Sequence, residues 1–281
     1  MAETKAAEDH WSSKAYQSSA SFVPKLATKV VRWLDVQPDD KILDIGCGDG
    51  VINLQVGEVL KKGSGKIHGT DASEAMIRTS KDDAEKAGLS DICTFEVLDT
   101  KNLIHHPALQ TAAFDKVFSN AALHWILRPE AMRRAVFAGV HAALRPHGRF
   151  VFEMGGMGNV AEMRTILLAV VARRVGIVRA RAADPWFFPD EEWMEKMLVE
   201  TGFVVERIER EYRPTKADEG GVEGWTRLMG KQFFDAVAPE GDSKREECIK
   251  EALEVIEGVC ESPGGGSWFG YVRLRAIARK I

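Results

Sequence analysis

Residues 43–50 read Leu43-Asp44-Ile45-Gly46-Cys47-Gly48-Asp49-Gly50, and this stretch decides the fold. A short apolar strand at 41–45 runs directly into three alternate glycines, and residues 51–60 have the apolar spacing of a helix. Glycine lets the backbone turn sharply and approach a ligand without a Cβ in the way. The following helix presents free N–H groups and the positive end of its dipole. We therefore predict a ligand-binding turn at the carboxyl end of a parallel strand.

Strands and helices alternate on both sides of this loop. Further strands are predicted at 66–70, 93–98, 114–119 and 148–153, and helices at 21–34, 73–87 and 129–144. Ser73 is the expected N-cap of its helix, and Gly88 ends it. This order predicts a doubly wound, mostly parallel α/β sheet.

The carboxyl-terminal half departs from that rhythm. Two strands, 203–212 and 268–280, flank a helical insertion, so we expect an antiparallel pair at one sheet edge. The predicted organisation is one domain over 1–281, with a ligand-binding core at 1–154 and helical cap insertions at 155–202 and 220–260.

The composition bounds the function. The chain has 281 residues and a net charge of −4, which disfavours nucleic acid as a partner because phosphate contacts need clustered cations. Its four cysteines form no CxxC pair and no cluster with zinc spacing, so no metal is expected. The chain starts polar and has no apolar stretch of about 20 residues. We expect a cytoplasmic protein without membrane contact, with monomer and homodimer left open.

Acidic residues around the glycine loop narrow the ligand. Asp44 and Asp49 would repel a pyrophosphate but suit the ammonium and sulfonium groups of S-adenosylmethionine (SAM). Asp71 ends the second strand, 25 residues after Gly46, where a carboxylate meets ribose hydroxyls. Asp99 ends the third strand and is placed to reach an adenine edge. The alternative, that Asp71 and Asp99 only cap turns, is the less favoured because both lie at the ligand edge of an open sheet.

The sequence resembles the class I SAM-dependent methyltransferases, and within them it is similar to the trans-aconitate methyltransferase-like group. The resemblance rests on LDIGCGDG at 43–50, GTDAS at 69–73 with Met76, LDT at 98–100 and SNAALHW at 119–125. Residues 11–23 and the YVRLR stretch at 271–275 also fit. The resemblance implies a seven-stranded, Rossmann-like sheet whose last strand is antiparallel.

It also implies a role for each matching residue. Gly46, Cys47 and Gly48 would meet the amino acid end of SAM, and the backbone carbonyl of Asn120 would hold its amino group. The ribose and adenine would be contacted by Asp71, Ala72, Met76, Asp99 and Thr100. Tyr16 and Phe22 would close over the cofactor from an amino-terminal helix.

The methyl acceptor is less defined, since displacement at a sulfonium needs alignment and exclusion of water more than a base. His124 is the candidate base; the alternative is a packing or substrate-orienting histidine. Glu153 either touches substrate or caps a loop, and Arg273 either binds a carboxylate or belongs to a salt-bridged strand face. Trp125, Trp186 and Trp225 are candidate walls of an enclosed apolar pocket, although such aromatics are more often core.

Three functions stay open at this point. The first is transfer of a methyl group from SAM to a small-molecule metabolite. The second is a SAM-binding protein without transfer, which regulates a partner or steers another reaction. The third is an NAD(P)-dependent reductase, which is disfavoured because the loop has GxGxG rather than GxGxxG spacing and position 49 is aspartate.

Overall fold

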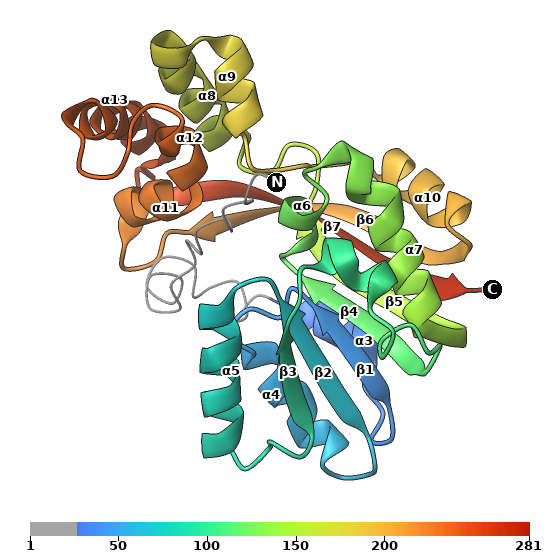
Figure 1. Cartoon of the computed structure of the whole chain (residues 1–281). Helices are drawn as coiled ribbons and strands as arrows, with labels where there is room; N and C mark the ends of the chain where they lie inside the picture. Colours follow the sequence, from blue (N-terminus) through green and yellow to red (C-terminus); the bar gives the residue numbers. More distant parts are fainter. Residues whose placement is uncertain (1–26) are drawn as a thin grey trace, which may run out of the picture.

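The computed structural model describes residues 27–281. At its centre lies a seven-stranded sheet in the order β3-β2-β1-β4-β5-β7-β6 (Figure 1). The first five strands in this order are parallel, and β7 runs antiparallel to both β5 and β6. The strands are β1 (Lys41–Ile45), β2 (Lys66–Asp71), β3 (Cys93–Val97), β4 (Phe114–Asn120), β5 (Leu144–Gly155), β6 (Phe203–Lys216) and β7 (Trp268–Lys280). The predicted doubly wound sheet with its antiparallel last strand is confirmed.

Two strands are longer than the sequence pattern predicts. β5 begins at Leu144, because that residue pairs with Phe114 of β4 before the register shifts. β6 continues to Lys216, because it stays paired with β7 as far as Trp268. Both extensions depend on a partner strand, which local patterning cannot reveal.

The central strands are apolar on both faces because helices cover both sides of the sheet. In β1, Ile42 packs with helix residues such as Val56, whereas Leu43 and Ile45 pack in a different buried cluster with Phe137. The side-chain period of two thus divides one short strand between two cores.

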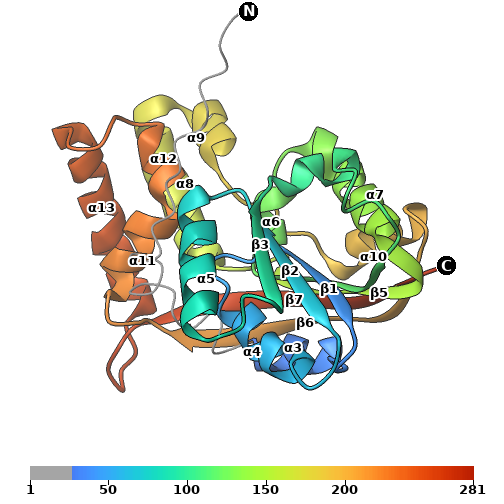
Figure 2. The same ribbon diagram turned by 60° about the horizontal axis from the view of Figure 1, so that its bottom comes forward.

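Helices form the two outer layers (Figures 1 and 2). The first layer holds α3 (Thr28–Leu34), α4 (Val51–Leu60) and α5 (Glu74–Lys86). The second holds the 3-10 helix η1 (Thr100–His105), α6 (Leu123–Ile126), α7 (Arg133–Ala143) and α10 (Glu191–Glu200), with a 3-10 turn η2 (Glu130–Met132) leading into α7. The Ser73 hydroxyl accepts from Met76 N–H as the N-cap of α5, which confirms that prediction. Only residues 28–34 of the predicted helix 21–34 fall within the described chain as helix.

A separate helical lobe lies beyond one end of the sheet, where β6 and β7 extend toward it (Figures 1 and 2). Its members are α8 (Ala161–Val175), α9 (Ile177–Ala183), α11 (Gly221–Met229), α12 (Lys231–Asp235) and α13 (Ser243–Cys260). They share one buried cluster, which Phe269 and Tyr271 of β7 join to the sheet.

One part of the expected cap lies elsewhere. Helix α10 falls inside the predicted insertion 155–202, yet its Met194 and Leu198 pack in the core beside α7 and Phe203. The reason is its amphipathic face, which buries against the sheet edge at β6 rather than against α8. The helical lobe therefore consists of α8, α9, α11, α12 and α13.

The topology locates the site. Chain connections leave β1 toward β2 on one side and β4 toward β5 on the other, so the strand order reverses between β1 and β4. Ligands of open α/β sheets bind in the crevice outside the carboxyl ends of the strands at such a point. Within residues 27–281, no helix is long and apolar enough to span a membrane.

Candidate functional site

The loop after β1 is held in a shape that only glycine adopts easily. Gly46, Gly48 and Gly50 have φ of 72°, 57° and 78°, the left-handed region. The N–H groups of Gly46 and Cys47 both donate to the carbonyl of Thr70 at the end of β2, at 2.7 and 3.0 Å. The loop is thereby fixed across the ends of two adjacent strands.

Two of these glycines face different surroundings. A Cβ on Gly46 would lie 2.2 Å from the Cβ of Ala122, so the segment after β4 packs directly on the loop. A Cβ on Gly48 would meet no atom within 4 Å, because this residue faces a cavity. Gly48 therefore leaves room for a ligand to touch the backbone.

Asp71 connects this loop to the end of β2. Its Oδ2 accepts from Gly48 N–H at 3.0 Å, and its Oδ1 accepts from Ser73 N–H at 2.9 Å. These bonds hold the carboxylate on the cavity wall, where ribose hydroxyls are expected.

Asp44 is the electrostatic centre of the loop. It is 3% exposed, lies on the cavity wall, and its Oδ1 has no hydrogen-bond partner in residues 27–281. Burial, followed by the nearby charge of Asp71, raises the pKa of Asp44 to about 8. A buried carboxylate beside a second one is stabilised by a cation, and the ammonium and sulfonium groups of SAM supply positive charge.

The cavity wall near β2 and β3 contains the residues that the resemblance implies for the adenosine. Asp99 follows β3 and fixes η1 by accepting from Lys101 N–H at 3.0 Å. Both Asp99 and Thr100 line the cavity, as do Ala72 and Met76 from the start of α5. These four residues lie in the segments that follow β2 and β3, which are neighbours in the sheet, so the topology brings them together.

Asn120 ends β4 and lies on the wall between the loop and the helical lobe. Its side-chain Oδ1 is buried without a hydrogen-bond partner in the described chain. The sequence pointed to the backbone carbonyl of this residue; the structure adds a second, unpaired oxygen. The residues of this region therefore fit SAM, because they offer orphaned acceptors and an acidic field where its cationic end would lie.

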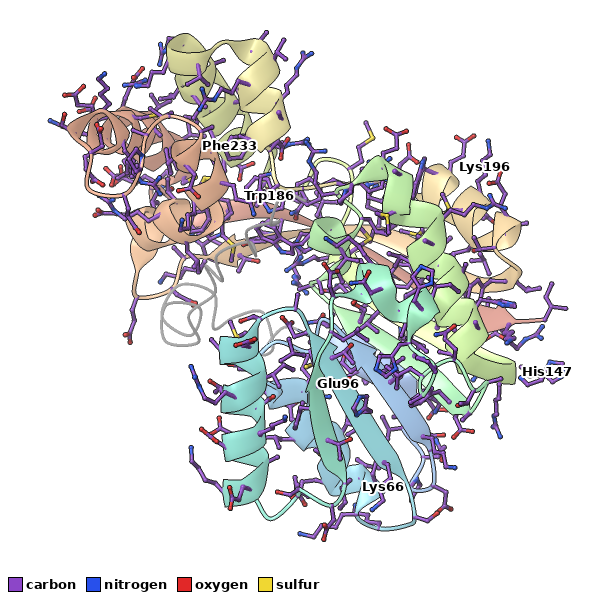
Figure 3. All side chains as sticks on the ribbon, viewed as in Figure 1. Lys66, Glu96, His147, Trp186, Lys196 and Phe233 are labelled. Atoms are coloured by element: carbon purple, nitrogen blue, oxygen red, sulfur yellow. The ribbon has the colours of Figure 1, made fainter. Side chains whose placement is uncertain are left out.

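The cavity, about 220 Å³, continues from the glycine loop to the helical lobe. Aromatic side chains line the far part: Trp125, Trp186, Phe188 and Trp225. Trp186 stacks on Phe188 at 5.8 Å between ring centroids, and Trp125 meets its edge at 5.7 Å. Figure 3 shows Trp186 at the junction of lobe and core, with Phe233 deeper in the lobe. The three tryptophans predicted as walls are brought together.

Arg273 adds a charge to this aromatic part. It is 2% exposed and lines the cavity, with its guanidinium 4.8 Å from the centre of the Tyr271 ring. Tyr271 lies two residues earlier on the same strand face, and its hydroxyl accepts from the Trp225 indole N–H at 2.7 Å. The Nε of Arg273 has no hydrogen-bond partner among residues 27–281.

Glu153 is not on the cavity wall, although it was a candidate substrate contact. Its Oε2 accepts from Arg275 Nε at 2.5 Å. Its Oε1 lies 3.4 Å from Arg273 Nε and 3.5 Å from Arg213. Strand pairing explains this position: Arg275 is directly opposite Glu153 in the β5–β7 register, so the carboxylate pairs with arginines of the sheet and does not face the cavity. Glu153 thus acts on the site only through these side chains.

His124 lies on the cavity wall within α6 and is buried. Its Nδ1 accepts from Gly155 N–H at 3.2 Å, and its backbone carbonyl accepts from Phe187 N–H at 2.9 Å. Burial lowers the pKa of His124 well below its ordinary value, and the positive charge of Arg273 lowers it further. The ring is neutral at physiological pH.

Several predictions fall outside this cavity, and several cavity residues escaped the sequence. Tyr16 and Phe22 lie outside the described residues. The additional wall residues include Asn159, Val160, Ile126, Met229 and Tyr271. The sequence positions of two of them could have predicted this place: Asn159 follows a strand end at the ligand edge, and Tyr271 shares a strand face with Arg273. Among residues 27–281, no three His, Cys, Asp or Glu side chains are grouped to hold a metal.

Comparison with known proteins agrees with this geometry. Residues 37–168 match the family model described as Methyltransferase domain. An uncharacterized methyltransferase, C70.08c, of Schizosaccharomyces pombe (strain 972 / ATCC 24843) is 39% identical over 278 residues, covering 97% of this chain and 99% of that protein.

Solved structures share the fold at low identity. The YcgJ protein from Bacillus subtilis superposes with a TM-score of 0.59 at 14% identity, covering 92% of this chain and 98% of that one. A geranyl diphosphate methyltransferase in complex with SAM gives a TM-score of 0.52 at 15% identity, covering 91% and 85%. With a full-length relative, a matching domain model and a SAM-fitting loop, the chain belongs to the class I SAM-dependent methyltransferases.

Proposed function

We propose that this enzyme transfers the methyl group of SAM to a small anionic molecule that has an apolar or aromatic body. The observation that carries the proposal is Arg273, a buried guanidinium whose Nε lacks a hydrogen bond on the wall of an aromatic cavity. The similarity to the trans-aconitate methyltransferase-like group stays a prediction.

The charges behind the wall support an anionic acceptor. The buried carboxylate of Glu153 is within 4 Å of three arginines, and among residues 27–281 it accepts a hydrogen bond from Arg275 alone. Arg275 also donates to Glu209 and Glu211. The Arg273 charge is therefore incompletely neutralised by the protein. A buried charge without a hydrogen-bonded partner is unfavourable, so a ligand anion is stabilised at this position.

The cavity walls support a small acceptor. The aromatic rings and the glycine loop line one continuous cavity, which suits an acceptor with an apolar body. A cavity of about 220 Å³ suits a small molecule better than a folded protein segment or a nucleic acid duplex.

Bound SAM supplies the methyl group: its S–CH₃ bond breaks, the electron pair stays on sulfur, and the acceptor's lone pair forms the new bond. The chain's own residues position the two reactants. Asp44 and Asn120 would receive the cationic end of the cofactor, and Arg273 would orient the acceptor. The alignment and the dry cavity are the protein's main contribution to the rate.

The direct test is an untargeted methylation screen. The protein is incubated with SAM and a metabolite extract, and mass spectrometry searches for products heavier by one CH₂. We expect methylated products that are carboxylates, phosphates or their methyl esters, and that disappear when the extract is first stripped of anions on an exchange resin.

Two variants sharpen the screen. Arg273→Gln should raise the KM of the acceptor by about 10- to 100-fold, because a charged hydrogen bond is lost, and leave SAM affinity unchanged. Arg279→Gln is the matched control, since Arg279 lies on the same strand but pairs with Glu206 at the surface. A neutral or macromolecular acceptor, or equal effects of the two substitutions, would contradict the proposal.

A further inference from the structure

His124 is held in the cavity wall by two backbone groups. The carbonyl of His124 accepts from Phe187 N–H, which ties α6 to the aromatic segment of the lobe. Its ring contacts two other rings of the wall, at 5.5 Å from Trp125 and 5.7 Å from Phe188 between centroids. The imidazole therefore has one packed orientation.

The Gly155 N–H that meets the ring has no strand partner on that side. β4 ends at Asn120, and the last bond between the two segments joins Ala121 N–H to the carbonyl of Glu153. On the opposite side of β5, the next residue already donates to Val272 of β7. The His124 ring occupies the place where β4 would have continued, and its Nδ1 accepts from Gly155 at 3.2 Å.

This bond decides which ring nitrogen carries the proton. A backbone N–H can only donate, so Nδ1 has to present its lone pair, and in a neutral imidazole the proton is then on Nε2. Protonation of Nδ1 would place two N–H groups against each other. Nε2 makes no hydrogen bond with any residue of the described chain, and the residue lies on the cavity wall.

Resting on the proposed methyl transfer, we propose that His124 binds the acceptor as a neutral hydrogen-bond donor through Nε2–H and takes no proton from it. The Nε2–H of His124 on α6 and the guanidinium of Arg273 on β7 would both bind the anionic group of the acceptor. The reacting atom then arrives already deprotonated: its lone pair bonds to the methyl carbon, the S–CH₃ pair goes to sulfur, and no proton passes through His124.

The tautomer is measured without any acceptor. Long-range ¹H–¹⁵N NMR of the full chain with S-adenosylhomocysteine resolves the rings of its seven histidines. The His124 signals are assigned from contacts with Trp125 and Phe188. We expect a proton on Nε2 and none on Nδ1, and we expect this state to stay unchanged from pH 8 to 6. The charged group that faces the ring is Arg273, which disfavours a second proton. An Nδ1–H tautomer, or an imidazolium at pH 7, would overturn the proposal whether or not methyl transfer is found.

Two substitutions separate a donor from a structural or basic role. Gln places an amide N–H near the Nε2 position but leaves Gly155 without its acceptor, whereas Asn keeps an oxygen for Gly155 and has no donor that reaches the cavity. With the acceptor from the methylation screen, we expect His124→Gln to keep kcat/KM within about five-fold of wild type and His124→Asn to lose about 10- to 100-fold.

If His124→Asn instead retains kcat/KM and His124→Gln loses it, His124 has a structural role. A loss of about 10²- to 10⁴-fold in both variants would assign it the role of base. Calorimetry with SAM checks that each variant retains the cofactor site, and the wild-type tautomer decides the matter if either variant fails to fold.

Discussion

The proton on Asp44 gives a sharp test of the cofactor site. Its pKa is raised to about 8 by burial and by Asp71, so the carboxyl is mostly protonated at pH 7 in the free protein. A cation beside the carboxyl favours the ionised form, so SAM binding should expel this proton. Asp44→Asn removes the titrating group and keeps its shape, so both the proton release and the pH dependence should disappear.

The magnitude follows from the pKa. At pH 7 a group of pKa about 8 is about nine-tenths protonated, so binding should release about 0.9 proton. Because the free protein holds more protons than the complex, SAM affinity falls as the pH falls below about 8. Between pH 7 and pH 6 the loss should be about tenfold, or about 1.4 kcal/mol.

Isothermal titration calorimetry measures both quantities. Proton release is obtained at pH 7 in two buffers of different ionisation enthalpy, and affinities are measured from pH 6 to 7.5, where the α-ammonium of the ligand stays mostly protonated. Asp39→Asn is the control, because this exposed carboxylate only accepts hydrogen bonds from Ser64. A flat affinity over this range with no net proton release would refute the assignment of Asp44 to the cationic end of SAM.

Three further predictions follow from the same structure. Gly46→Ala puts a Cβ 2.2 Å from that of Ala122 at a φ of +72°, so it should cost more than about 2 kcal/mol in thermal unfolding and abolish SAM binding; normal binding would contradict the loop geometry. Trp225→Phe removes the indole N–H that donates to the cavity tyrosine and should lower the free energy of unfolding by about 1–2 kcal/mol in urea, whereas no change would show that this bond is not formed. Without SAM, Asp44→Asn should be more stable than wild type at pH 8 but not at pH 4. The pKa of Asp44 is higher in the folded protein than its unfolded value of 3.8, so the wild type loses stability as the pH rises between the two values. Equal urea midpoints of the two proteins at pH 8 would exclude the raised pKa.

The cofactor half of the site was predictable because its residues follow strands directly. Asp71, Asp99 and Asn120 end or follow β2, β3 and β4, and the carboxyl ends of parallel strands meet at one edge. Gly46 and Gly48 were recognisable because a left-handed turn before a helix requires glycine. These are local signals, and adjacency in sequence is enough to read them.

The acceptor half was only partly predictable because its residues come from separate segments. The pattern of 268–280 suggested a strand, but it could not tell that Arg275 would occupy Glu153 and leave Arg273 on the cavity wall. Helix α10 looked like part of the cap and instead covers the sheet edge. Strand register and helix docking depend on distant partners, so neither is encoded in a local window.

The sheet, the glycine loop and the carboxylates of the cavity wall could thus be read from the amino-acid sequence, because each depends on residues close together along the chain. The protonation of the His124 ring on the acceptor side could be read only from the tertiary structure. The end of β4 exposes the Gly155 N–H, the His124 ring takes it, and this contact places the proton on Nε2. The physical reason is that a proton's position on an imidazole depends on what the other nitrogen touches, and that neighbour lies 31 residues away.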